Sequence, residues 1–166
     1  MPDGTATHVS STRPTGAPSV VYFRQEGTMY DVPIDVLWDF MIWEGHGAAH
    51  EQSLRNMTVL EETPSGVLYA CETRRGGEWR KITGRVVDFP PLGRFVQETE
   101  GLYKGTQMVF LYTPAGRKTR LDIVARFVSD ELDPETLERH MADSIDFAGV
   151  EDDPYLRSFV HGRTLG

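Results

Sequence analysis

The stretch Met29-Tyr-Asp-Val-Pro-Ile-Asp-Val-Leu-Trp-Asp-Phe40 joins an extended segment to a short helix. Pro33 suits the first position of a helix, because its missing N–H needs no partner there and its φ angle is already helical. Apolar residues then recur at i, i+3, i+4 and i+7 spacing, which gives the helix one buried face: Ile34, Leu37, Trp38 and Met41. The sequence therefore predicts a strand that passes directly into a short, one-sided helix.

Most of the remaining chain alternates between β-prone runs and tight turns. The predicted strands cover residues 19–30, 56–62, 67–73, 78–89, 94–100, 106–113 and 118–128. In the last of them Leu121, Ile123, Ala125 and Phe127 alternate with polar residues, so this set is the predicted buried face.

A final helix is predicted to begin at Asp133, a capping carboxylate followed by Pro134 at the first helical position. Its apolar stripe continues along the helix, and Gly149 and Pro154 predict a kink or break within it. Residues 1–17 offer almost nothing to bury, so we predict a disordered leader before a single domain over 18–166.

This order of elements, with Val32-Pro33 entering the helix and Trp38-Asp39-Phe40 inside it, resembles the START and Bet v 1-like (SRPBCC, polyketide cyclase/dehydrase) superfamily. The resemblance implies an α+β helix-grip fold. About six to seven strands would form a curved antiparallel sheet wrapped around the C-terminal helix, with two short helices after the first strand. It also implies an internal cavity for a small hydrophobic molecule.

Composition excludes several other classes of function. The net charge of −8 and the pI near 5.1 argue against nucleic acid and anionic membranes as partners. We interpret Arg74, Arg75 and Arg80 as a solvated hairpin tip, and Cys71, the only cysteine, as a buried, inert thiol. With no apolar run long enough for a membrane span, we expect a cytoplasmic monomer or homodimer.

The resemblance places the ligand between the concave face of the sheet and the last helix. Polar residues on otherwise apolar faces are then candidates to orient it. We predict that the cavity is lined by Trp38, Trp79, Gln97, Phe110, Met141 and Ile145. We predict hydrogen-bonding or electrostatic roles for Tyr69, Tyr112 and Arg126, with His50 or His140 as the proton carrier. If the register of a strand is wrong by one residue, the residues predicted to line the cavity lie on the outer surface of the sheet instead.

One further motif is His46-x-x-x-His50. Two histidines four residues apart on a helical turn can both bind one metal ion, although no third ligand can be assigned. The main interpretation requires no cofactor.

Three functions remain open at this point. The first is cyclisation, dehydration or a related proton transfer on a polyketide-like molecule, in which confinement of the substrate does most of the work. The second is a carrier of a lipid or hydrophobic metabolite, and the third is a metal-dependent oxygenase-like activity at His46 and His50. No nucleophile elbow, phosphate loop or dinucleotide-binding motif occurs.

Overall fold

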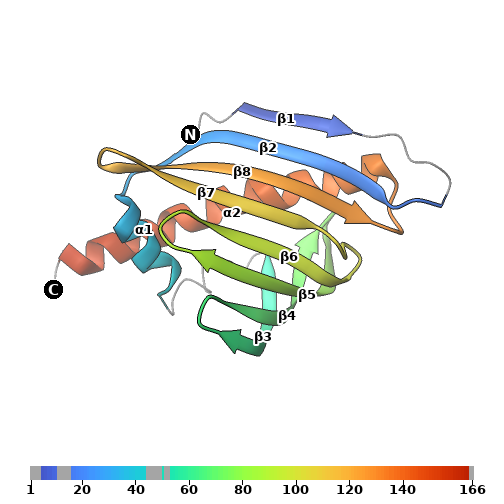
Figure 1. Cartoon of the computed structure of the whole chain (residues 1–166), viewed down its shortest axis with the longest axis horizontal. Helices are drawn as coiled ribbons and strands as arrows, with labels where there is room; N and C mark the ends of the chain where they lie inside the picture. Colours follow the sequence, from blue (N-terminus) through green and yellow to red (C-terminus); the bar gives the residue numbers. More distant parts are fainter. Residues whose placement is uncertain (1–4, 11–15, 44–49, 51–52, 165–166) are drawn as a thin grey trace.

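The computed structural model describes residues 5–10, 16–43, 50 and 53–164, with side chains described outside 5–10, 145–153 and 164. One antiparallel sheet has the strand order β1-β2-β8-β7-β6-β5-β4-β3 (Figure 1). The strands are β1 (Thr5–Ser10), β2 (Ser19–Tyr30), β3 (Leu54–Thr63), β4 (Gly66–Arg75), β5 (Glu78–Phe89), β6 (Gly93–Gly101), β7 (Gln107–Ala115) and β8 (Lys118–Ser129). The helices are α1 (Ile34–Met41) and α2 (Pro134–Thr164).

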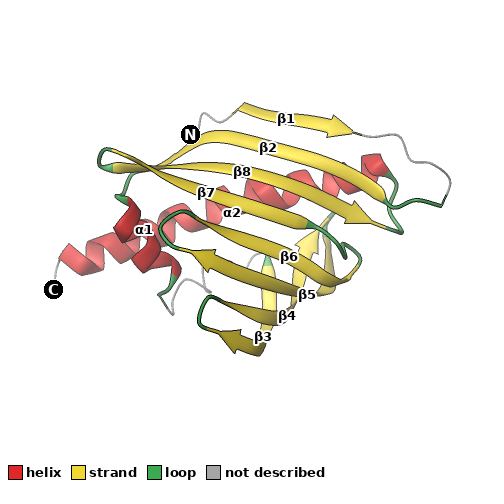
Figure 2. Ribbon diagram, viewed as in Figure 1, coloured by secondary structure: helices red, strands yellow, loops and turns green. Residues whose placement is uncertain are grey.

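Both helices lie on the same side of this sheet. Figure 2 shows α2 passing behind the strands and α1 at one end of the sheet. We call the side toward α2 the inner face and the opposite side the outer face. The predicted alternation on β8 is confirmed, because Leu121, Ile123, Ala125 and Phe127 are all buried. The hydrophobic core thus lies between the inner face and the helices.

The α1 helix has the predicted one-sided packing. Leu37 and Trp38 are buried, while Ile34 and Met41 pack on the core with part of their surface exposed. Pro33 is the N-cap with an extended ψ of 157°, so the helix begins one residue later than predicted. The carbonyl of Pro33 still accepts the first helical bond, from the Leu37 amide at 3.0 Å.

The start of α2 is confirmed in detail. The Asp133 carboxylate accepts a hydrogen bond from the Thr136 amide at 2.9 Å, and this bond lowers the pKa of Asp133. Pro134 is the first helical residue, as predicted. The predicted break does not occur, since one helix runs through Pro154 to Thr164. Packing against the sheet favours the helix over the local preference of proline for a kink.

The α+β helix-grip fold class is confirmed, with one correction. The sheet has eight strands, because Thr5–Ser10 forms β1 along the edge of β2. This segment lies inside the predicted disordered leader. Backbone pairing orders it, and the β-branched Thr5, Thr7 and Val9 favour a strand despite their small apolar content. The second short helix was predicted around residues 46–51, most of which lie outside the described residues.

Neither described helix is long and apolar enough to cross a membrane.

Candidate functional site

A buried ion pair lies on the inner face, far from solvent. Arg75 ends β4 and Glu98 lies on β6, and their side chains expose only 6% and 1% of their surface. The Arg75 Nη2 donates to Glu98 Oε1, and the Arg75 Nε donates to Ser144 Oγ of α2 at 2.7 Å. Burial lowers the pKa of Arg75, but the Glu98 carboxylate outweighs this effect and the net pKa is raised. The guanidinium is therefore held in its charged form.

The Arg75–Glu98 pair has unused hydrogen-bonding capacity. Arg75 Nη1 and Glu98 Oε2 are buried and have no hydrogen-bond partner among the described residues. Because an unsatisfied polar group in a protein interior costs free energy, such atoms are expected to meet a partner that completes them. Together they offer an unused donor and an unused acceptor from one ion pair to a bound molecule.

Tyr103 and His140 support this pair from the α2 side. The Tyr103 ring lies 4.5 Å from the Arg75 Cζ, measured to the ring centroid, in a cation–π contact. The Tyr103 hydroxyl and His140 Nδ1 are 2.9 Å apart. Burial raises the pKa of Tyr103 to about 12 and lowers the pKa of His140, which Asp143 opposes. A neutral His140 can accept the Tyr103 proton in this bond.

Tyr69 adds a second hydroxyl near Glu98. It is 7% exposed, and its hydroxyl has no hydrogen-bond partner among the described residues. Burial, followed by the charge of Glu98, raises the pKa of Tyr69, so the hydroxyl stays neutral and can donate. Gly84 makes the space for it, because a Cβ at that position would lie 2.6 Å from the Tyr69 oxygen.

A second ion pair balances the charge of the inner face. Arg94 and Asp88 are direct cross-strand neighbours, joined by two bonds of 2.6 and 3.0 Å between their charged groups. Arg75 and Arg94 each have a carboxylate partner, so neither of these two arginines leaves a net charge for a ligand to neutralise.

Apolar side chains between the two ion pairs keep part of their surface accessible. These partly buried residues are Val67 on β4, Val86 on β5, and Met108 and Phe110 on β7. They pack against the core, but part of each side chain remains exposed. The inner face thus combines apolar surface with a few placed polar groups, which is the usual composition of a small-molecule site.

Besides His140, which lies beside the Arg75–Glu98 pair through its bond with Tyr103, five predicted site residues lie on the inner side. Tyr69 and Tyr112 are buried, and Trp38 packs edge-on against Tyr112 with ring centroids 5.5 Å apart. Phe110 shares their face, and Met141 of α2 is buried against the core. Among these residues, only Tyr69 lies close to the Arg75–Glu98 pair.

Three predicted residues lie on the wrong face for an inner site. Arg126 is the direct neighbour of Gln107 on β7, and Gln107 is the direct neighbour of Gln97 on β6. Arg126 and Gln97 therefore share the face opposite the buried Phe127. Trp79 neighbours the exposed Arg74 and stacks under Arg55 on the outer face. Side chains alternate along a strand, and the alternation was interpreted one residue out of phase at these positions.

The remaining predicted residues lie in, or next to, segments outside the described residues. His50 is described, and its carbonyl accepts a hydrogen bond from the Ser53 amide at 3.0 Å. His46 and the side chain of Ile145 lie outside the described residues. In the part of the chain that the structure does describe, no three His, Cys, Asp or Glu side chains gather as a metal site would require.

Sequence reasoning missed the central residues of this site. Arg75 was interpreted as part of a solvated hairpin tip, and Glu98 and Tyr103 were not singled out. The period of two along β4 could have found Arg75, since Tyr69, Cys71, Thr73 and Arg75 are all buried on one face. The expected inert Cys71 fits this environment, where burial raises the pKa of the thiol to about 11.

An open hollow of about 630 Å³ lies over β4, β5 and β6. Its polar lining comes from outward-facing side chains, including Glu72, Lys81 and Glu100. Glu72 is already bound by Arg55 and Asn56. This hollow presents no buried unmatched polar atom, so the inner face is the stronger candidate site.

No known family model matches the sequence, and no curated protein is significantly similar to it. Solved structures do match. The ZhuI aromatase/cyclase from Streptomyces sp. R1128 has a TM-score of 0.61 at 16% identity, over 86% of this chain and 94% of that one. The Ara h 8.0201 structure gives 0.66 at 11% identity, over 84% and 99%. The chain therefore has the same helix-grip fold as these structures.

A human protein domain also has a similar fold. The lipid transfer and protein localization domain of human StarD13 matches with a TM-score of 0.56 at 13% identity, over 92% of this chain and 88% of that one. The predicted resemblance is thus confirmed at the level of the fold.

Proposed function

We propose that this protein binds an uncharged, largely apolar small molecule on the inner face and transfers protons on it, as a polyketide cyclase- or dehydrase-like enzyme. The observation that carries the proposal is the Arg75–Glu98 pair with its unmatched donor and acceptor. The ligand has one polar end, with an acceptor and a donor on neighbouring atoms, that completes both. Apolar burial against the half-covered inner face supplies most of the affinity.

The charge balance of the inner face selects against ions. A ligand carboxylate near Arg75 would also lie near Glu98, and a ligand ammonium near Glu98 would lie near Arg75. In a low-dielectric interior an uncompensated charge is costly. A ketone, enol or amide avoids this cost, because it donates and accepts without adding charge.

The same groups suit proton transfer next to a carbonyl. Arg75 Nη1 would donate to the carbonyl oxygen and stabilise the negative charge that develops there. Glu98 Oε2, buried and without another donor, would accept the proton from the adjacent carbon. Tyr69 would donate a hydrogen bond to a second oxygen of the substrate. His140 acts through Tyr103 and is a positioning residue.

The structural neighbours support this assignment only as analogues of the fold. One is an aromatase/cyclase and another a lipid transfer domain. A buried ion pair contributes little net stability compared with apolar packing. Its presence in the core therefore favours chemistry over simple carriage of a lipid.

The binding preference can be tested with two probes of nearly the same shape, 2-naphthamide and 2-naphthoate. We expect calorimetric titration to show the amide binding at least tenfold more tightly than the carboxylate. A variant with Arg75→Met and Glu98→Leu together should bind the amide at least tenfold more weakly than the wild-type protein does, while it still binds naphthalene. Both groups are replaced because a single change would leave an unpaired buried charge.

The matched control is Arg74→Met, which removes the neighbouring arginine from the exposed face. It should keep the wild-type preference. Equal affinities for the two probes in the wild-type protein, or a preference for the carboxylate, would overturn the proposal.

A further inference from the structure

A row of apolar side chains crosses the outer face of the sheet. Val124 on β8, Val109 on β7, Phe95 on β6 and Val87 on β5 are direct cross-strand neighbours in sequence along the row. Val124 is 49% exposed, and the adjacent Leu111 is 45% exposed. The solvent face of an antiparallel sheet is usually polar, and a continuous apolar strip on it marks an interaction surface.

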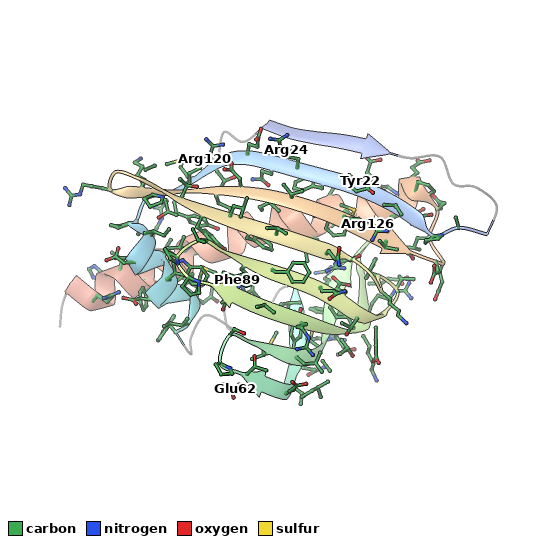
Figure 3. All side chains as sticks on the ribbon, in the orientation of Figure 1. Tyr22, Arg24, Glu62, Phe89, Arg120 and Arg126 are labelled. Carbon is green, nitrogen blue, oxygen red and sulfur yellow. The ribbon has the colours of Figure 1, made fainter. Side chains whose placement is uncertain are left out.

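Opposite charges flank this row on β8. Asp122, Val124 and Arg126 share the outer face because they alternate along the strand. Figure 3 shows Arg126 and Tyr22 on this face. Arg126 forms no ion pair or hydrogen bond with any described residue. Asp122 uses only Oδ1, which accepts from the Gly27 amide at 2.8 Å and from Arg120.

We infer that this face binds a second copy of the chain, sheet against sheet, about a two-fold axis that crosses the strands at Val124 and Val109. Such an axis lays β8 antiparallel over β8 of the partner subunit. Val124 then meets its own copy, and Arg126 faces Asp122 of the partner subunit. Both ion pairs form at once, because the two-fold axis repeats each contact.

The neighbouring strands obey the same symmetry. On β5, Arg85 and Phe89 lie two residues to either side of Val87, so Arg85 would face the ring of Phe89 of the partner subunit. Phe89 is 54% exposed and available for this contact. On β6, the Gln97 side chain would lie over Gly93 of the partner subunit, where no side chain obstructs it. On β8, β6 and β5 the face is therefore complementary to itself, while on β2 the axis lays Arg24 over its own copy, with Glu26 as the ion-pair partner that offsets its charge.

The size of the face sets the strength of the dimer. Four strands spaced about 4.8 Å apart span roughly 14 Å, and residues 120–126 span about 20 Å along β8. The projected area of roughly 300 Å² lies below the ~800 Å² of accessible surface that a stable interface buries on each partner. We therefore expect a dimer that forms in the micromolar range and dissociates on dilution.

Sedimentation equilibrium between about 1 and 500 μM tests this directly. The wild-type chain should shift from monomer to dimer within the range. Arg126→Asp places two like charges opposite each other and should raise the dissociation constant at least tenfold. Combining it with Asp122→Arg restores opposite charges and should recover the wild-type value within about threefold. Arg139→Asp makes the same charge change on α2 and should have no effect.

A second measurement remains informative if the change at Asp122 disturbs its contact with Gly27. Val124→Cys lies on the axis and should be cross-linked to its copy by a short bismaleimide. Thr113→Cys lies on the same face four residues from the axis, about 27 Å from its copy, and should not react. A wild-type chain that stays monomeric at 500 μM, or equal cross-linking at both positions, would overturn the inference.

Discussion

Arg74 and Arg75 are sequence neighbours with opposite environments. Arg74 faces solvent, whereas Arg75 is 5% exposed and bound to Glu98 under the α2 helix. Only the pleat of β4 separates them, because successive side chains point to opposite faces of a sheet. The chemistry of the site therefore depends on strand register to within a single residue.

His140 gives the fold a dependence on pH. Burial lowers its pKa below the ordinary value of 6.5, so the folded state binds a proton less readily than the unfolded chain. As the pH falls below about 6.5, the unfolded chain gains a proton that the folded state does not, and the free energy of unfolding falls. The loss continues until the pH reaches the lowered pKa of the folded state, and none is expected above pH 7.5.

Melting temperatures measured between pH 8 and pH 5 will show this effect. The His140→Gln variant has no such proton to bind, so its stability should fall less than that of the wild-type protein over this range. Parallel curves for the two proteins would contradict the assigned environment of His140.

At the scale of elements, Trp38 joins α1 to the sheet through a hydrogen bond and a ring contact. Trp38 donates from Nε1 to the carbonyl of Pro91, in the β5–β6 turn, at 3.0 Å, and packs edge-on against Tyr112. This contact joins segments 53 residues apart. It closes the end of the inner face that lies away from the Arg75–Glu98 pair.

Replacing Trp38 should loosen this closure in two stages. Trp38→Phe keeps the apolar contact but loses the hydrogen bond, at a cost of about 1 kcal/mol. Trp38→Ala also leaves a cavity, at a cost of about 3–5 kcal/mol. Urea unfolding provides both values. Trp43→Phe, at a 42% exposed position, is the control and should change stability by about 0.5 kcal/mol or less. A neutral Trp38→Phe would show that the bond to Pro91 does not hold α1.

The sequence predicts most elements because their signals are local. Proline and aspartate mark the start of each helix, and glycine turns separate the strands. Two features of the fold depend on distant partners instead. β1 is ordered by pairing with β2, and α2 continues through Pro154. In both cases the partner that decides the structure lies elsewhere in the chain, and the local signal alone is too weak to predict it.

The site is harder to predict than the fold, for the same reason. Glu98 on β6, Tyr103 in the turn after it and Ser144 on α2 are all distant from Arg75 in the chain, and all three meet at Arg75. A charged residue in a strand usually indicates the exposed face, so Arg75 was interpreted as solvated. Only the tertiary structure shows that its charge is compensated.

At the scale of the whole molecule, the two faces of one sheet have different roles in this account. The inner face holds the polar groups proposed for chemistry, and the outer face carries the self-complementary surface proposed for dimerisation. Dilution should therefore change the oligomeric state without removing any group from the proposed active site.

The most direct test of the central claim is hydrogen exchange on a model ketone. In heavy water, the methyl protons of 2-acetylnaphthalene are lost from the proton NMR spectrum when a base removes them and deuterium replaces them. We predict that the wild-type protein accelerates this exchange at least tenfold over buffer, that Arg74→Met retains the acceleration, and that the combined Arg75→Met, Glu98→Leu variant abolishes it. Binding of the ketone by the wild-type protein with exchange at the buffer rate would contradict the account and identify a carrier.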